Sequence, residues 1–133
     1  MSHGPGGTLQ ELSEEQCRDL LGEHVLGRLV WNGSAGIHVA PVNYALDGDR
    51  VVVRVSAASS VAREAEDSPV AFEVDHLDHE TRTGWSVLVR GTARIDFHEH
   101  EEIPEVDVWP AGPRTLVLLV EIAQLTGREV TEP

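Results

Sequence analysis

The chain has 133 residues, a common size for a single domain, and 41% of them are hydrophobic, which is enough to build one buried core. The chain contains 10 basic and 23 acidic residues. The resulting net charge of −13 argues against nucleic acid and anionic membranes as partners, because both would be repelled. The single cysteine, Cys17, excludes an intrachain disulfide and a metal site built from thiolates.

The N-terminal stretch MSHGPGGTLQEL has neither the basic nor the apolar region of a signal peptide. No apolar run approaches the ~20 residues that span a bilayer. We therefore expect a soluble, cytoplasmic protein. Glycine and proline in residues 1–8 predict a flexible tail, and residues 9–133 show no boundary that would divide a single domain.

A helix is predicted for residues 13–22. Ser13 and Gln16 occupy the two positions of a capping box, in which each side chain bonds the backbone of the other. Cys17, Leu20 and Leu21 follow at helical spacing and would share one face.

Three short strands should come next, because three apolar stretches are separated by the turn signals NGSAG and DGD. They cover residues 27–33, 37–46 and 50–56. In the third strand, alternation puts Val51, Val53 and Val55 on one face and Val52, Arg54 and Ser56 on the other.

A second helix is predicted for residues 59–67, and three further strands for residues 70–74, 85–97 and 115–122. A polar loop fills 75–84, and a short helical turn is expected at 99–102. The pattern contains no alternation of strands with long helices. It predicts a mainly β protein, a small antiparallel barrel of about six strands with two short helices.

The stretch VVVRVSAASSVAREA raises the question of why an arginine interrupts a run of valines. Arg54 precedes the serines Ser59 and Ser60, which fall where a helix should begin. The first amides of a helix lack partners within the helix and favour an anion, and an arginine grips phosphate through paired N–H groups. The stretch therefore favours a phosphate site. The alternative is plain helix capping by the serines and a solvated arginine.

Several motifs along the chain, taken together and in order, resemble the pyridoxamine 5′-phosphate oxidase-like family, specifically its short flavin-binding, nitroimidazole-resistance-like branch. They are PVNY at 41–44, FEVD at 72–75, GWSV at 84–87 with Gly91, and TGR at 126–128. The resemblance extends from about Leu12 to Glu129. It implies a split β-barrel, a homodimer, and FMN bound in grooves at the subunit interface.

The resemblance also implies roles for single residues. Asn43, with Val42 and Tyr44, would line the flavin ring. The remaining contacts would come from three places: the strand with Arg54, Val55 and Ser56, the helix start with Ser59 and Ser60, and the groove with Trp85, Ser86 and Trp109. The ring carries the chemistry, so no catalytic acid or base is assigned, and an oxidoreductase that transfers hydride to or from a small molecule is expected.

One position departs from the family pattern. Many members have a lysine two residues after the position of Ser59, where this chain has Val61. Two alternatives to FMN therefore stay open, the deazaflavin F420 and a barrel without flavin that acts as a binding module.

Other chemistries find less support in the sequence. Two histidine pairs, His76 with His79 and His98 with His100, lie in acidic polar segments, where solvated surface is the default, and no metal site is assigned. No nucleophile-elbow sequence is present, which argues against a hydrolase.

Overall fold

A computed structural model of the chain describes residues 6–96 and 103–133. Within them, seven antiparallel strands form one sheet, accompanied by two helices. The strands are β1 (Thr8–Glu11), β2 (Leu26–Gly33), β3 (Gly36–Asp47), β4 (Arg50–Val55), β5 (Pro69–Asp78), β6 (Thr83–Asp96) and β7 (Leu116–Thr131), and the helices are α1 (Glu14–Gly22) and α2 (Ser60–Glu64).

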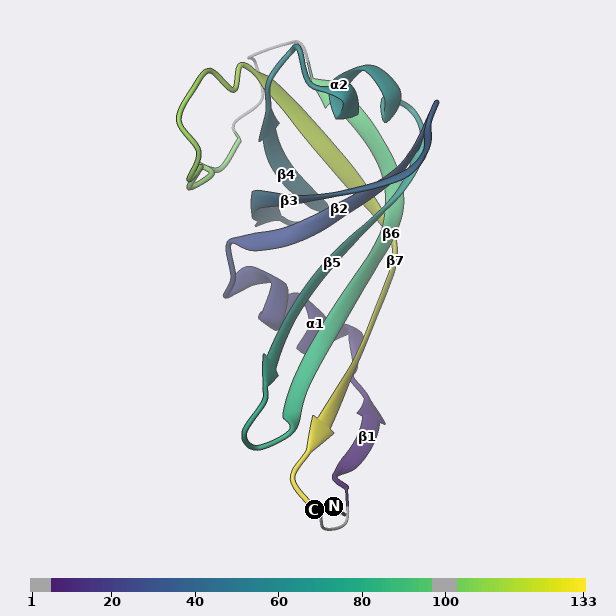
Figure 1. Cartoon of the computed structure of the whole chain (residues 1–133), viewed down its shortest axis with the longest axis vertical. Helices are drawn as coiled ribbons and strands as arrows, with labels where there is room; N and C mark the ends of the chain where they lie inside the picture. Colours follow the sequence, from purple (N-terminus) through teal and green to yellow (C-terminus); the bar gives the residue numbers. More distant parts are fainter. Residues whose placement is uncertain (1–5, 97–102) are drawn as a thin grey trace.

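The sheet closes on itself. Its strand order is β1-β7-β4-β3-β2-β5-β6, and β7 also pairs with β6, so β2 to β7 form a ring to which β1 is added. The long strands β6 and β7 run along the molecule, with α2 at one end and both chain termini at the other (Figure 1). This arrangement confirms the predicted mainly β split barrel. No helix in the described part of the chain has the length and apolarity needed to cross a bilayer.

The largest differences from the predicted strands are an additional strand and two extensions. Residues 8–11 form β1, which was not predicted; β5 continues to Asp78, and β7 continues to Thr131. In these places backbone pairing extends strands through polar sequence, since β7 is bonded on one edge to β6 and on the other to β1. The helical turn expected at 99–102 and Phe97 lie outside the described residues.

Gly91 accommodates an irregularity in the longest pairing. The register of β6 against β7 shifts between Arg90 and Gly91, as in a β-bulge. A Cβ atom on Gly91 would lie 2.0 Å from the carbonyl oxygen of Glu121, so a side chain cannot fit there without backbone movement.

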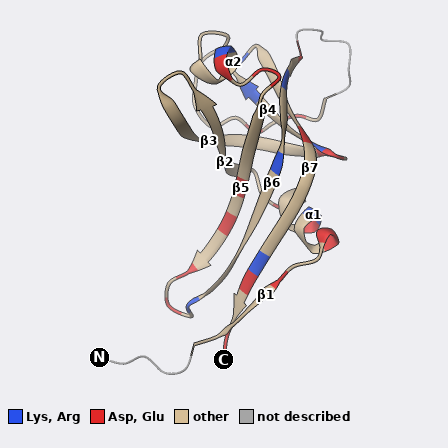
Figure 2. Ribbon diagram, turned by 90° about the vertical axis from the view of Figure 1, so that its right-hand side faces the viewer, with Lys and Arg blue, Asp and Glu red and all other residues tan. Residues whose placement is uncertain are grey.

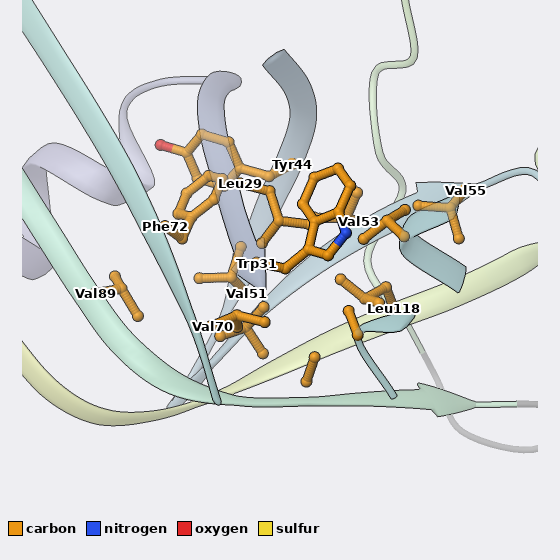
Figure 3. Close-up of a cluster of buried hydrophobic side chains, with 14 of the residues drawn as sticks. Leu29, Trp31, Tyr44, Val51, Val53, Val55, Val70, Phe72, Val89 and Leu118 are labelled. Carbon is orange, nitrogen blue, oxygen red and sulfur yellow. The ribbon is translucent and has the colours of Figure 1, made fainter. Parts of the chain in front are cut away.

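The barrel interior holds the main core. Figure 3 shows Leu29, Trp31, Tyr44, Phe72 and neighbouring valines packed together. Tyr44 meets Phe72 edge to face, with ring centroids 4.8 Å apart. The capping box of Ser13 and Gln16 forms as predicted, and Cys17 and Leu21 of α1 join the core. Burial raises the pKa of the Cys17 thiol.

Strand β4 is buried on both faces, which accounts for its run of valines. Val51, Val53 and Val55 face the barrel core, as predicted. On the other face Val52 packs with Val117 and Leu119 of β7, and the segment 103–115 covers them by inserting Val106. Arg54 is the next residue on this second face and lies just beyond that cover. The interruption of the valines therefore coincides with the edge of a small second core.

Candidate functional site

A cavity of about 460 Å³ lies beside β4, at the edge of the second core. Two groups of residues line it. The barrel side contributes Leu26, Pro41, Val42, Asn43, Arg54, Val55, Ser56, Ser59 and Val61, and the segment 103–115 contributes Val108, Trp109, Pro110 and Arg114. Figure 1 shows this segment (yellow-green) next to β4 at the end of the molecule that carries α2.

Charge is distributed unevenly between this cavity and the rest of the chain. Acidic residues are spread over α1, β5 and other elements in Figure 2. Yet the only ionisable side chains that line the cavity, among the described residues, are the arginines Arg54 and Arg114. In a chain with 23 acidic residues, a cavity with two guanidinium groups and no carboxylate favours an anionic ligand.

Neither arginine pairs with a carboxylate in the part of the chain that the structure describes. Arg54, which is half-buried, makes no ion pair or hydrogen bond with any residue that the structure describes. Arg114 donates one bond from Nη1 to the carbonyl oxygen of Pro113, at 3.3 Å. By contrast, Arg18, Arg28 and Arg94 each pair with carboxylates. The two cavity arginines thus keep their paired N–H donors available.

The serines near Arg54 are partly occupied by local bonds. The Ser59 hydroxyl caps α2 by accepting a bond from the Ala62 amide and donates one to the Ser56 carbonyl oxygen, at 3.4 and 2.7 Å. The Ser56 hydroxyl accepts a bond from the Ala58 amide, which leaves its own hydrogen free to donate. Because α2 has only five residues, the side chains rather than a helix dipole must supply any anion contact.

Asn43 is almost covered, although it lines the cavity. Its Oδ1 accepts a bond from the backbone amide of Trp109 at 2.8 Å, and its Nδ2 donates to the carbonyl oxygen of Val25 at 3.2 Å. The side chain therefore connects the barrel to the segment that forms the opposite wall.

The structure brings seven of the eleven predicted site residues to this cavity. They are Val42, Asn43, Arg54, Val55, Ser56, Ser59 and Trp109. Tyr44 lies in the core instead, where its hydroxyl donates to the carbonyl oxygen of Leu21 at 2.6 Å and burial raises its pKa well above the ordinary value. Ser60 is the first residue of α2 and is absent from the cavity lining.

Trp85 and Ser86 lie on a different part of the sheet. Trp85 packs against His24, with ring centroids 4.9 Å apart. Ser86 lines a second cavity of about 670 Å³ between β1 and the paired strands β5, β6 and β7. In one copy of the chain, these two residues do not share the arginine-lined cavity.

A charged cluster borders this second cavity. Arg28 of β2 donates to Glu73 of β5, with its Nε 2.9 Å from Oε1, and its Nη2 lies 2.7 Å from Oδ2 of Asp75. Desolvation and the neighbouring Asp75 raise the pKa of Glu73, against the opposing effect of Arg28. The lining of the second cavity thus combines carboxylates with Arg128, whose side chain has no partner among the described residues, whereas the lining of the first has no carboxylate.

Sequence reasoning did not predict the contribution of Val108, Pro110 and Arg114. The sequence offered one signal, an arginine after Gly112-Pro113 in a loop rich in proline. A loop arginine alone does not indicate a site, because its position depends on how Val106 docks on the second core. His98 and His100 lie outside the described residues, and no group of three or more histidine, cysteine or acidic side chains in the described part is placed to hold a metal.

Fold and cavity together define a split β-barrel with an arginine-lined cavity between its wall and a covering loop. A family model described as pyridoxamine 5′-phosphate oxidase matches residues 13–129, and the chain belongs to this family. The family resemblance seen in the sequence is thereby confirmed.

Individual relatives agree with this assignment. The FAD-binding protein from Mycobacterium smegmatis is 30% identical, with a TM-score of 0.73 over 93% of this chain and 100% of that one. A protein provisionally named pyridoxamine 5′-phosphate oxidase, from Corynebacterium glutamicum, is 25% identical, with a TM-score of 0.81 over 98% of both chains. Uncharacterized protein Rv0080 of Mycobacterium tuberculosis is 40% identical over 88 residues, which span 62% of this chain and 58% of that protein.

Proposed function

We propose that this chain is a cytoplasmic flavoprotein that binds FMN in the arginine-lined cavity and transfers hydride to or from a small molecule. The observation that carries the proposal is the pair Arg54 and Arg114, which line one cavity without a carboxylate. A flavin nucleotide matches that cavity chemically, because it joins a phosphate dianion to a flat, largely apolar ring. The cavity volume of about 460 Å³ lies within the range of small-molecule sites.

Different residues of the chain would bind the phosphate and the ring of the flavin. Arg54, with the free hydroxyl hydrogen of Ser56, would hold the phosphate at the β4 end. Val42, Val55 and Trp109 would pack on the ring and exclude water. When bound, the flavin supplies the redox chemistry itself, and the protein controls orientation, electrostatics and access.

The choice of flavin is a finer part of the proposal. FMN agrees with the family resemblance, whereas the relative from M. smegmatis is named as an FAD-binding protein. FAD is therefore a second candidate, and Arg114 offers a cation for its additional phosphate. F420 and a barrel without flavin remain alternatives because Val61 stands where many family members have lysine.

We also propose that the chain forms a homodimer through the outer face of the sheet. Cross-strand partners share a face, so Val39, Val30 and Ala71 lie in one row, next to the row of Pro41, Arg28, Glu73 and Leu88. Ile37 and Val39 on this face are 76% and 61% exposed. A partner would cover them together with the second cavity, which Ser86 lines.

The dimer is tested by size-exclusion chromatography with light scattering. We expect a dimer for the wild type and a monomer for Val39→Glu, because burying an unpaired carboxylate in an apolar interface is costly. A monomeric wild type at tens of micromolar would contradict the dimer.

Colour tests the flavin itself. Protein purified under native conditions should be yellow, keep its flavin absorbance through gel filtration, and release a flavin whose mass distinguishes FMN, FAD and F420. A colourless protein that takes up no flavin when one is added at tens of micromolar would favour the binding-module alternative.

A further inference from the structure

Among the described residues, Asn43 is the only buried residue with a side-chain amide or a charge, and it is 8% exposed. Both of its ends bond the chain itself, Oδ1 to the amide of Trp109 and Nδ2 to the carbonyl oxygen of Val25. These bonds use one N–H and one lone pair of Oδ1, and each ties the side chain to a different segment of the chain. Asn43 is therefore placed as a brace between two parts of the fold.

The residue that Asn43 holds is an exposed tryptophan. Trp109 is 61% exposed, yet it is fixed at two points, since its backbone amide donates to Asn43 and its Nε1 donates to Oδ2 of Asp107 at 3.2 Å. Trp109 also lines the arginine-lined cavity. An aromatic ring fixed by hydrogen bonds rather than by burial is preorganised to stack on a planar ligand.

The covering segment has a second attachment on its other side. Val106 is buried against Val52 and Leu119, and Ile103 and Val108 pack against the same cluster. This apolar anchor is independent of Asn43. Loss of the Asn43 bonds should therefore free the cavity-facing part of the segment and leave the anchor at Val106 in place.

We propose that Asn43 is a positioning residue that holds the Trp109 wall of the cavity so that the indole packs against the ring of the bound flavin. The positioning of the wall stands on the geometry alone, whereas the stacking on a flavin rests on the proposed function. The two parts are tested separately.

Hydrogen exchange in the unliganded wild type tests the brace without any substitution. The Trp109 amide, followed by nuclear magnetic resonance, should exchange at least about tenfold more slowly than an unbonded amide of an exposed loop, because its hydrogen bond must open first. Exchange at the unprotected rate would overturn the inference.

Trypsin offers a second test, because Arg114 is the only basic residue between Arg94 and Arg128. In Asn43→Leu, which keeps the side-chain size but makes neither bond, cleavage after Arg114 should rise at least about tenfold. Cleavage after Arg90, in the middle of β6, serves as the internal control for general destabilisation. Asn43→Asp keeps an acceptor for the Trp109 amide, so its cleavage should fall between those of the wild type and Asn43→Leu. An Arg114 to Arg90 cleavage ratio that is unchanged in Asn43→Leu would overturn the positioning role.

Quenching of FMN fluorescence tests the stacking. Wild type should quench bound FMN strongly, and both Trp109→Leu and Asn43→Leu should lose most of that quenching, but only Asn43→Leu should also show faster cleavage after Arg114. If the wild type binds no FMN, the proposed function and the stacking fail, while slow amide exchange and the cleavage result would still support the brace. If Asn43→Leu quenches FMN like the wild type, the positioning role fails and the proposed function survives.

Discussion

Arg54 of β4 and Arg114 of the loop before β7 line the same cavity, although they lie far apart in the sequence. Each keeps guanidinium donors free of carboxylates in the described part of the chain. Two unpaired like charges beside one cavity repel each other, and a bound anion relieves that repulsion. This relationship connects the fold to the proposed flavin site.

Restoring the family's lysine should strengthen phosphate binding. Val61 lines the cavity, so the ammonium of Val61→Lys would reach the region of Arg54 and Ser56. We expect FMN affinity to rise about tenfold, the value of one hydrogen bond to a charged group. Calorimetric titration measures the change, with Val61→Met as the uncharged control of similar length. Equal affinities for the two variants would show that this position does not face the phosphate.

Removal of the Tyr44 hydroxyl should destabilise the barrel at neutral pH. The hydroxyl donates to the carbonyl oxygen of Leu21 and connects β3 to α1, so Tyr44→Phe leaves this oxygen with only the long bond from the His24 amide, at 3.5 Å. We expect a loss of about 1–2 kcal/mol in the free energy of unfolding, measured with urea at pH 8. A loss below a few tenths of a kcal/mol would contradict the structural role of this bond.

The same pair gives a prediction on pH. Burial raises the pKa of Tyr44 in the folded state, so the unfolded state ionises first and gains stability as pH rises above about 10. The difference in the free energy of unfolding between wild type and Tyr44→Phe has its full value below that pH. It should shrink by about 1.4 kcal/mol at pH 11. Urea unfolding of both proteins at pH 8 and pH 11 gives the difference. A constant gap would mean that Tyr44 ionises equally in both states.

Arg28 should stabilise the fold more at neutral than at acidic pH. It lies between Glu73 and Asp75, and Arg28→Gln would leave two neighbouring carboxylates without their cation. The pKa of Glu73, already raised, would rise further, so stability is lost as pH increases through its titration. Because these groups are partly exposed, we expect Arg28→Gln to lower the free energy of unfolding by only about 1 kcal/mol at pH 7, and by less toward pH 4. Arg82→Gln in the exposed β5–β6 turn is the control. An equal loss of stability at pH 7 and pH 4 would contradict the proposed effect of Arg28 on Glu73.

The fold could be predicted largely because its strands follow local patterns. Alternation in β4 placed Val51 and Val53 on one face and Arg54 on the other, and the structure agrees. The second half of β7 could not be predicted in this way. Its partners, β6 and β1, supply backbone bonds that do not depend on apolar side chains. The polar residues of this half therefore show no pattern that predicts a strand.

The site could be predicted only in part, for a related reason. Arg54, Ser56 and Ser59 are close in sequence, and their common location follows from one strand and one turn. Arg114 and Val108 reach the same cavity only because Val106 docks on Val52 across the sheet. That contact is tertiary, and no local pattern indicates it.

The most direct test compares FMN with riboflavin, which lacks the phosphate. Titration calorimetry should show that wild type prefers FMN by at least about tenfold, and that Arg54→Ala loses most of this preference while binding riboflavin as before. The control Arg82→Ala, in an exposed turn away from the cavity, should keep the wild-type preference. If wild type and Arg54→Ala bind FMN equally well, Arg54 does not hold the phosphate and the proposed site is contradicted.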